Sequence, residues 1–265
     1  RPFGDNCGFT MAESAQFAVL MDDELALELG ADILGAVPDV FVHADGAKKS
    51  ISSPGIGNYL TLARSANLVR QLLGEDALRE RSYVHAHGTG TPQNRVTESV
   101  ILDRVAEAFG VRHWPVTAIK AFVGHSLGSA GGDQLAATLG SFAQGILPGI
   151  RTIDHIASDV HRQHLDFAMD HVPRDDLQAS LINSKGFGGN NATAVALSAR
   201  VTEAMLQQRH GSKAISHWQT ARDTVLQAKS RFRDHCLHEA PKPVYRFNEG
   251  VMGDEAGTLT GDAMQ

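Results

Sequence analysis

The apolar positions of this chain recur with two periods, one typical of helices and one typical of strands. Where apolar residues return every three or four positions, one face of a helix is predicted to be buried. These segments are residues 24–29, 59–73, 97–109 and 134–143. Apolar runs bounded by turn residues predict strands instead. These runs are residues 8–21, 33–43, 83–86, 116–119, 179–183 and 193–197.

The segments alternate between strand and helix for most of the chain, which predicts an α/β fold with helices covering a mixed sheet. From about Val201 the sequence becomes richer in Arg, Gln and His, and residues 215–238 are predicted to form one long helix. Its apolar positions follow helical spacing and are Ile215, Trp218, Ala221, Val225 and Phe232. We therefore predict an α/β domain at residues 1–200 and a helical extension with a tail at residues 201–265.

The composition limits the classes of protein to consider. A hydrophobic content of 42% in 265 residues is enough for a substantial core. No apolar run approaches the roughly 20 residues of a membrane span, and the N-terminus lacks a secretory signal pattern. The net charge of −6 gives no support to nucleic-acid binding, and the 2 cysteines, far apart, indicate a reducing compartment. We therefore expect a cytoplasmic protein without a membrane or nucleic-acid partner.

Glycine-rich blocks carry the candidate chemistry. The first is His-Gly-Thr-Gly-Thr-Pro at residues 87–92, the second is Lys-Ala-Phe-Val-Gly-His at residues 120–125, and the third is Asn-Ser-Lys-Gly-Phe-Gly-Gly-Asn-Asn at residues 183–191. A histidine titrates near neutral pH, a glycine lets the backbone approach a ligand closely, and a threonine hydroxyl both donates and accepts hydrogen bonds. The two histidine blocks together indicate an acid–base and oxyanion site.

These blocks, preceded by Arg-Pro-Phe at residues 1–3, occur in the order found in β-ketoacyl synthases. As far as about Arg200, the chain resembles the C-terminal half of such a synthase, a condensing enzyme of the thiolase-like superfamily. The resemblance implies a thiolase-like α/β fold and an acyltransferase that condenses malonyl-acyl carrier protein with an acyl thioester, by decarboxylation, in fatty-acid or polyketide biosynthesis. It also implies a homodimer that needs no cofactor, because the substrates are carried on the phosphopantetheine of the acyl carrier protein or on coenzyme A.

The resemblance assigns the oxyanion chemistry to the histidine blocks. His87 and His125 are expected to donate hydrogen bonds from Nε2 to the thioester oxygen on which charge develops. Lys120 is expected to orient the histidines and tune them electrostatically without attacking the substrate. Phe187 matches the aromatic residue whose N–H completes the oxyanion hole and whose ring gates the acyl pocket.

Other residues match positions that bind the substrate arm or support the loops. Thr89 and Thr91 match the threonines that bind the amides of the phosphopantetheine arm. Glu98 matches a glutamate eleven residues after the first histidine, and Asp45 is similar to part of another substrate-side loop. We therefore predict two pantetheine-binding threonines and two supporting carboxylates.

At further positions the chain departs from the family pattern. Gln134 stands where the family has a glutamate that pairs with the lysine. We expect either that another carboxylate compensates the charge of Lys120, with Asp133 the nearest in sequence, or that the pKa of Lys120 is lowered. Arg95 replaces an aspartate, and Lys185 replaces an aromatic residue in the third block. The family's account of acyl-chain selectivity therefore does not carry over.

A condensing enzyme also needs a cysteine nucleophile at a strand-to-helix turn, where a helix N-terminus lowers the thiol pKa. Cys7 lies in a loop and Cys236 in the extension, so neither has that context. We therefore expect the nucleophile upstream of this chain. An acidic acyl carrier protein would bind a basic patch. The candidates are Lys48, Lys49, Arg64 and Arg70.

Two other functions stay open. Residues 124–128 fit the Gly-x-Ser-x-Gly elbow of α/β-hydrolases, which would make Ser126 a nucleophile between a strand and a helix, with His87 and Gly88 imitating the oxyanion loop. Its acid and base would come from Asp154, Asp159, His161, His164 and His171. The other alternative is a non-catalytic ketosynthase partner of the chain-length-factor type. No metal site is predicted, because the histidines lack a recognisable spacing to further ligands.

Overall fold

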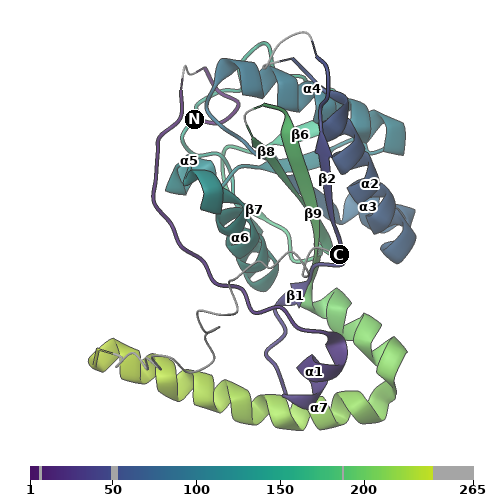
Figure 1. The fold of residues 1–265 in the computed structure, drawn as a ribbon, viewed down its shortest axis with the longest axis vertical. Helices are drawn as coiled ribbons and strands as arrows, with labels where there is room; N and C mark the ends of the chain where they lie inside the picture. The colour runs from purple at the N-terminus through teal and green to yellow at the C-terminus, as the bar shows by residue number, and fades with distance from the viewer. Residues whose placement is uncertain (6–7, 49–52, 187, 241–265) are drawn as a thin grey trace, which may run out of the picture.

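A mixed sheet forms the centre of the molecule. The computed structural model describes residues 1–5, 8–48, 53–186 and 188–240. The strands of the main sheet are β1 (Gly35–Ala36), β2 (Val40–Ala44), β3 (Ser82–His85), β4 (Trp114–Thr117), β6 (Leu165–Phe167), β8 (Ala179–Gly186) and β9 (Asn190–Ser198). β1 and β2 pair with β9, and the order continues through β8, β3 and β4 to β6 (Figure 1). β3 is parallel to β4 and β8, whereas β8 and β9 are antiparallel, so the predicted mixed sheet is confirmed.

Helices cover both faces of this sheet. They are α2 (Ile56–Leu73), α3 (Glu75–Glu80), α4 (Pro92–Phe109), α5 (Lys120–Val123) and α6 (Ala130–Gln144). Figure 1 shows α2, α3 and α4 on one side and α5 and α6 on the other. Leu62 of α2 and Leu102 of α4 are fully buried against Val84 and Leu181 of the sheet. A second, small sheet pairs β5 (Ile146–Leu147) with β7 (Val172–Pro173).

Every predicted helix of the α/β part is present, but two predicted strands differ from the structure. The prediction of a strand at residues 8–21 is wrong: within the described chain, the backbone there forms no more than a bridge between Met11 and His125. Its alternating apolar residues suit a strand, but a strand also needs a partner to pair with. The strand predicted at residues 33–43 is broken into β1 and β2 around Pro38, which has no N–H to donate.

The helix predicted at residues 215–238 is part of a longer helix, α7 (Ala199–His238), which bends at Gly211. Ile215 and Trp218 are buried together with Leu27 of α1 (Asp23–Glu28). Phe232 is 64% exposed, so the apolar pattern extends past the packed part of the helix. None of the described helices is both long and apolar enough to cross a membrane.

The division of the chain at residues 200 and 201 stays a prediction. α7 begins at that division and forms a cluster of its own with α1, at the lower end of Figure 1. Of the predicted tail, residues 241–265 lie outside the described part of the chain.

Candidate active site

The two histidine blocks meet at one edge of the sheet, where adjacent parallel strands end. β3 leads directly to His87, and β4 leads through α5 to His125. Because the carboxyl ends of neighbouring parallel strands lie together, the two loops come close to each other. The centroids of the two rings are 5.3 Å apart and the ring planes are nearly perpendicular, at 83°. A side chain at Gly88 would collide with Ala118, so glycine is required for this close approach.

Backbone hydrogen bonds set the same tautomer in both rings. The Nδ1 of His87 accepts from the N–H of Lys185 at 3.3 Å, and the Nδ1 of His125 accepts from the N–H of Leu127 at 3.2 Å. A neutral ring that accepts at Nδ1 carries its proton on Nε2. Burial lowers the pKa of His87 well below its usual value and also lowers the pKa of His125, and the Lys120 ammonium adds to both shifts. Both rings are therefore neutral at physiological pH, each with an Nε2–H to donate.

A buried carboxylate holds the backbone of the first histidine block. Glu98 of α4 accepts hydrogen bonds from the N–H groups of His87 at 2.7 Å and Gly88 at 2.9 Å. It also accepts from the amide groups of Asn94 at 2.9 Å and Asn183 at 2.7 Å. Asn183, the first residue of the third block, therefore helps to position the loop through its contact with Glu98. The supporting role of Glu98 in the reaction stays a prediction.

Lys120 lies beneath the same loop. Its Nζ donates to the carbonyl oxygen of His87 at 2.6 Å. Burial lowers the pKa of Lys120 to about 8, while Glu98 and Asp133 act in the opposite direction. Both expected ways of accommodating the lysine charge therefore occur together: carboxylates lie near it, and its pKa is lowered.

Gln134 supports the site through the ends of the strands and not through the lysine. Its Nε2 donates to three carbonyl oxygens, those of His85 at 3.1 Å, Ala86 at 2.9 Å and Asn183 at 3.0 Å. Its Oε1 accepts from the hydroxyl of Ser184 at 3.0 Å. An amide suits this position because it donates to backbone carbonyls that a carboxylate would repel.

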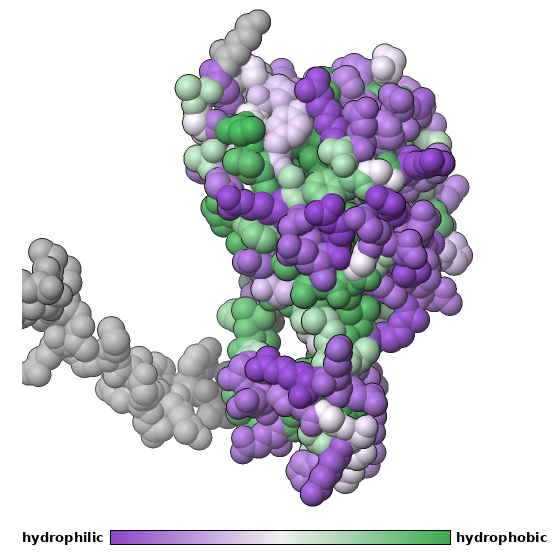
Figure 2. Space-filling view, turned by 90° about the vertical axis from the view of Figure 1, so that its right-hand side faces the viewer, coloured by the Kyte–Doolittle hydropathy of each residue, from purple (hydrophilic) through white to green (hydrophobic). Residues whose placement is uncertain are grey.

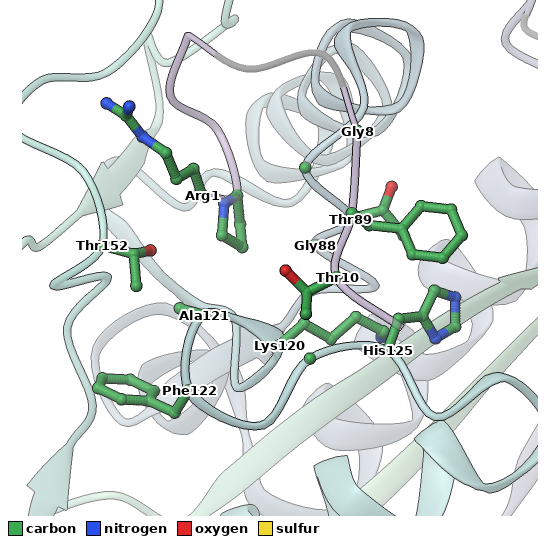
Figure 3. A pocket seen from close by; sticks show the side chains of 14 residues that line it. Arg1, Gly8, Thr10, Gly88, Thr89, Lys120, Ala121, Phe122, His125 and Thr152 are labelled. Atoms are coloured by element: carbon green, nitrogen blue, oxygen red, sulfur yellow. The ribbon is translucent and has the colours of Figure 1, made fainter. Parts of the chain in front are cut away.

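Two pockets adjoin the histidines. The larger has a volume of about 730 Å³ and is lined by both histidines, Thr89, Thr91 and Asp45. The smaller, of about 380 Å³, is shown in Figure 3, where Thr89, Lys120 and His125 lie around it. The hydroxyl oxygens of Thr89 and Thr91 are 3.1 Å apart. The predicted pantetheine-binding threonines therefore line a pocket that also reaches both histidines.

The wall opposite the threonines contains Asp45. Asp45 is buried, pairs with Lys48 at 2.8 Å and accepts from the side-chain amide of Asn191 at 2.8 Å. Phe187, predicted to complete the oxyanion hole, lies outside the described residues. Of its neighbours, Gly186 lines the larger pocket.

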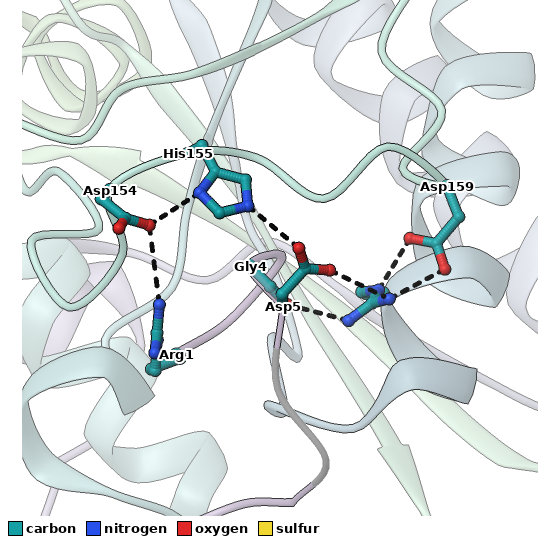
Figure 4. A network of polar contacts seen from close by, with 7 residues as sticks. Arg1, Gly4, Asp5, Asp154, His155 and Asp159 are labelled. Atoms are coloured by element: carbon teal, nitrogen blue, oxygen red, sulfur yellow. Dashed lines mark hydrogen bonds and ion pairs between the residues drawn. The ribbon is translucent and has the colours of Figure 1, made fainter.

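A polar network that includes Arg95 holds the N-terminal segment. Asp5, His155 and Asp159 of this network are labelled in Figure 4. The Arg95 guanidinium donates to both carboxylate oxygens of Asp159, at 2.7 and 2.9 Å, and to the carbonyl oxygen of Gly4 at 2.9 Å. His155 contacts Asp5 in the same network, at 2.9 Å. The replacement of the family aspartate by Arg95 therefore serves the attachment of this segment.

The hydrolase alternative is wrong, because the segment around Ser126 is not a nucleophile elbow. Ser126 is separated from α5 by Gly124 and His125 and is not directly preceded by a strand, and the 3-10 turn Leu127–Ser129 lies between it and α6. The Ser126 hydroxyl donates to Asp133. Asp159, one of the proposed triad acids, is engaged by Arg95.

Of the cations predicted to form a basic patch, Lys48 and Arg70 lie near carboxylates, and Arg64 is exposed on α2. Lys48 is paired with Asp45, and Arg70 of α2 approaches Glu75 at 3.7 Å. Lys49 lies outside the described residues. Figure 2 shows that the face turned toward the viewer, on the side of α2, α3 and α4, is mainly hydrophilic, with hydrophobic patches at its upper left and along the narrow region below. A carrier-binding role for these cations stays a prediction.

Of the two cysteines, Cys236 is not placed to act as a nucleophile of this site. Cys236 lies near the end of α7 and does not line either pocket, and Cys7 lies outside the described residues. In the described part of the chain, no group of three or more His, Cys, Asp or Glu side chains is arranged to hold a metal ion.

Comparison with known proteins identifies the family. Residues 36–154 match the model of the β-ketoacyl synthase C-terminal domain. The chain is 54% identical over 257 residues to the β-ketoacyl-[acyl-carrier-protein] synthase FabY of Pseudomonas aeruginosa, covering 97% of this chain and 40% of that protein. The chain belongs to the β-ketoacyl synthase family. It corresponds to the C-terminal part of a ketosynthase, as the order of the sequence blocks indicated.

Two further comparisons agree with this assignment. The crystal structure of FabY superimposes on this ketosynthase chain with a TM-score of 0.91, covering 98% of this chain and 41% of the other. The 3-oxoacyl-[acyl-carrier-protein] synthase 2 of Synechocystis is 30% identical over 202 residues, covering 73% of this chain and 45% of that protein. The chain thus spans less than half the length of these relatives.

Proposed function

We propose that this chain is the C-terminal catalytic part of a β-ketoacyl-acyl carrier protein synthase of fatty-acid biosynthesis. The reaction is the decarboxylative Claisen condensation of malonyl-acyl carrier protein with an acyl thioester. The observation that carries the proposal is the pair of neutral histidines, His87 and His125, whose Nε2–H groups are free to donate beside a pocket. The name of the relative that is 54% identical supports the same substrate class.

The chemistry requires stabilisation of an enolate. When malonyl thioester loses carbon dioxide, negative charge develops on the thioester oxygen. Two N–H donors held by a fixed backbone stabilise that charge without rearranging, and each is worth about 3 kcal/mol in comparable oxyanion sites. His87 is held by Glu98 and Lys120, so its position is set before substrate binds.

The remaining parts of the enzyme follow from this assignment. The acyl group is carried on a cysteine that belongs to the upstream part of the protein. Thr89 and Thr91 bind the phosphopantetheine arm of the acyl carrier protein, and the Phe187 N–H completes the oxyanion hole. The enzyme works as a cytoplasmic homodimer and uses no cofactor of its own. A non-catalytic chain-length-factor role is disfavoured, because His87, His125 and Lys120 are all present in an organised site.

The test is malonyl-acyl carrier protein decarboxylation and condensation by the full-length protein. His87→Ala and His125→Ala are each expected to lower the rate of decarboxylation by about 100-fold or more, since each removes one oxyanion donor. Transfer of an acyl group to the nucleophile should stay within about threefold of the unmodified protein, because it does not pass through the enolate. Decarboxylation at an unchanged rate in both variants, or a full-length protein that forms no β-ketoacyl product, would overturn the proposal.

A further inference from the structure

Lys185 places a positive charge beside the larger pocket. It lies in β8 directly opposite Asn191 of β9, and both residues line that pocket. Directly opposite residues of an antiparallel pair point to the same face of the sheet. The Asn191 side chain contacts Asp45 in the pocket wall, so the Lys185 side chain lies on that same face.

The other charges of the pocket wall are already balanced. Asp45 is paired with Lys48 and accepts a hydrogen bond from Asn191. The two histidines are neutral. Glu98 does not line the pocket, and its carboxylate oxygens accept from His87, Gly88, Asn94 and Asn183.

Lys185 is therefore the exception among the pocket's charges. Within the described ranges, no side chain hydrogen-bonds to its ammonium group or forms a close ion pair with it, and the carboxylates of Glu98 and Asp45, which act on it electrostatically, are already engaged by the donors named above. A half-buried cation without a close partner is costly, so the pocket favours an anionic ligand.

The same residue is next to the reaction centre. The backbone N–H of Lys185 donates to Nδ1 of His87, and both residues line the larger pocket. The Lys185 ammonium also acts electrostatically on the His87 ring, so an anion that it binds would lie in the same pocket as that ring. In a malonyl thioester the carboxylate is separated from the thioester carbonyl by a single methylene group, so one molecule can reach both.

We propose that Lys185 binds the carboxylate of the malonyl unit and so selects a 2-carboxyacyl thioester over an uncharged one. This rests on the proposed function. In the reaction, the bond between the carboxylate carbon and the α-carbon breaks, its electron pair forms the enolate, and neutral carbon dioxide leaves. The ion pair is lost as that bond breaks, so Lys185 contributes to substrate binding and orientation and not to stabilisation of the transition state.

The experiment compares Lys185→Met, Lys185→Arg and a control, Lys213→Met, in the full-length protein. Lys213 is an exposed lysine of α7 and lines neither pocket. In Lys185→Met the KM for malonyl-acyl carrier protein is expected to rise about tenfold or more, because a charged hydrogen bond is lost. The kcat should stay within about threefold, and both Lys185→Arg and the control should keep KM within about threefold.

A second measurement uses two malonyl-pantetheine analogues that cannot lose carbon dioxide, one with the carboxylate and one with a primary amide in its place. The unmodified protein is expected to bind the carboxylate about tenfold more tightly than the amide, and Lys185→Met should bind the two about equally. The proposal would be overturned if Lys185→Met left both the KM and the preference for the carboxylate analogue unchanged. It would also be overturned if Lys185→Met impaired acyl transfer as much as it impaired malonyl binding and Lys185→Arg did not restore acyl transfer. If the full-length protein had no condensing activity but still preferred the carboxylate analogue, and Lys185→Met removed that preference, only the proposed function would be overturned.

Discussion

Lys120 acts on the two histidine blocks from a buried position. Its ammonium group donates to the carbonyl oxygen of His87, and after burial it is the second cause that lowers the pKa of His87 and His125. Its own pKa is lowered to about 8 by burial. The group is therefore protonated below that pH and loses its charge above it.

The pH dependence of decarboxylation should report this ionisation. We expect the rate to fall as pH rises through about 8, because neutral Lys120 no longer holds the His87 loop electrostatically. At lower pH the rate should stay constant until the pH is below the usual histidine pKa, because the pKa values of His87 and His125 are lowered. The measurement is kcat for malonyl-acyl carrier protein decarboxylation across pH in the full-length protein. Lys120→Met is expected to have a lower kcat than the unmodified protein and no decrease in kcat above about pH 8. If kcat still decreased at alkaline pH in this variant, another group would be responsible for the titration.

His85, two residues before His87, lies in the core. Its Nδ1 lies 3.1 Å from the hydroxyl of Thr138, and its Nε2 accepts from the N–H of Ile119 at 3.3 Å. Burial, with Lys120 as a second cause, lowers the pKa of His85 to about 3. The residue is therefore a neutral connector between β3 and the segment that carries Lys120.

The catalytic loop depends on three elements that meet at one carboxylate. Glu98 belongs to α4, His87 follows β3, and Asn183 belongs to β8. α4 can present Glu98 at this place because Pro92 begins the helix and the buried face of the helix packs on the sheet. The position of the histidine is thus a property of the packing of helix against sheet.

Glu98→Gln should weaken this connection. The new NH₂ group would face N–H donors of the His87 loop, so we expect the free energy of unfolding to fall by about 2 kcal/mol and decarboxylation to fall with it. Glu107→Gln is the matched control, because Glu107 is an exposed residue of the same helix. Urea denaturation of the full-length proteins, followed by circular dichroism, measures the difference. Equal stability of the two variants would show that the Glu98 contacts contribute little.

The molecule consists of a sheet-centred body and a helical part formed by α1 and α7 (Figure 1). Trp218 belongs to the core of the helical part: it is fully buried, and its indole N–H donates to the carbonyl oxygen of Ala31, just after α1, at 3.0 Å. Arg222 lies 5.0 Å above its ring centroid. Farther along α7, Phe232 is mostly exposed. The two aromatic residues of the same helix should therefore contribute differently to the free energy of unfolding.

This contrast can be measured. Trp218→Ala is expected to lower the free energy of unfolding by about 3 to 5 kcal/mol, as is usual for truncation of a large buried aromatic side chain. Phe232→Ala should change it by less than about 0.5 kcal/mol, because the side chain is largely in water. Chemical denaturation of both full-length variants, followed by circular dichroism, tests this. A similar loss in both would mean that Phe232 packs against another part of the protein.

Local patterns were enough to predict α1, α2, α4 and α6 and the strands β3, β4, β8 and β9, because periodicity and short motifs depend on residues close together in the chain. They did not predict the short elements α3, α5, β5, β6 and β7. They failed at residues 8–21, where the pattern of a strand is present but no pairing strand lies in the described chain. They also left the charge balance of Lys120 open, because its carboxylates come from different elements.

The residues of the family blocks could thus be predicted from sequence, whereas their states depend on contacts between distant segments. The tautomer of His87 is set by Lys185, 98 residues away, and the His87 loop is held by Glu98, which is itself contacted by Asn183, 85 residues away. The unbalanced charge of Lys185 emerges only when Asp45 and Lys48 are seen to neutralise each other across the same pocket. Hydrogen bonds and electrostatic interactions act through space over a few ångströms, so these properties follow from the packing of the folded chain and not from the order of its residues.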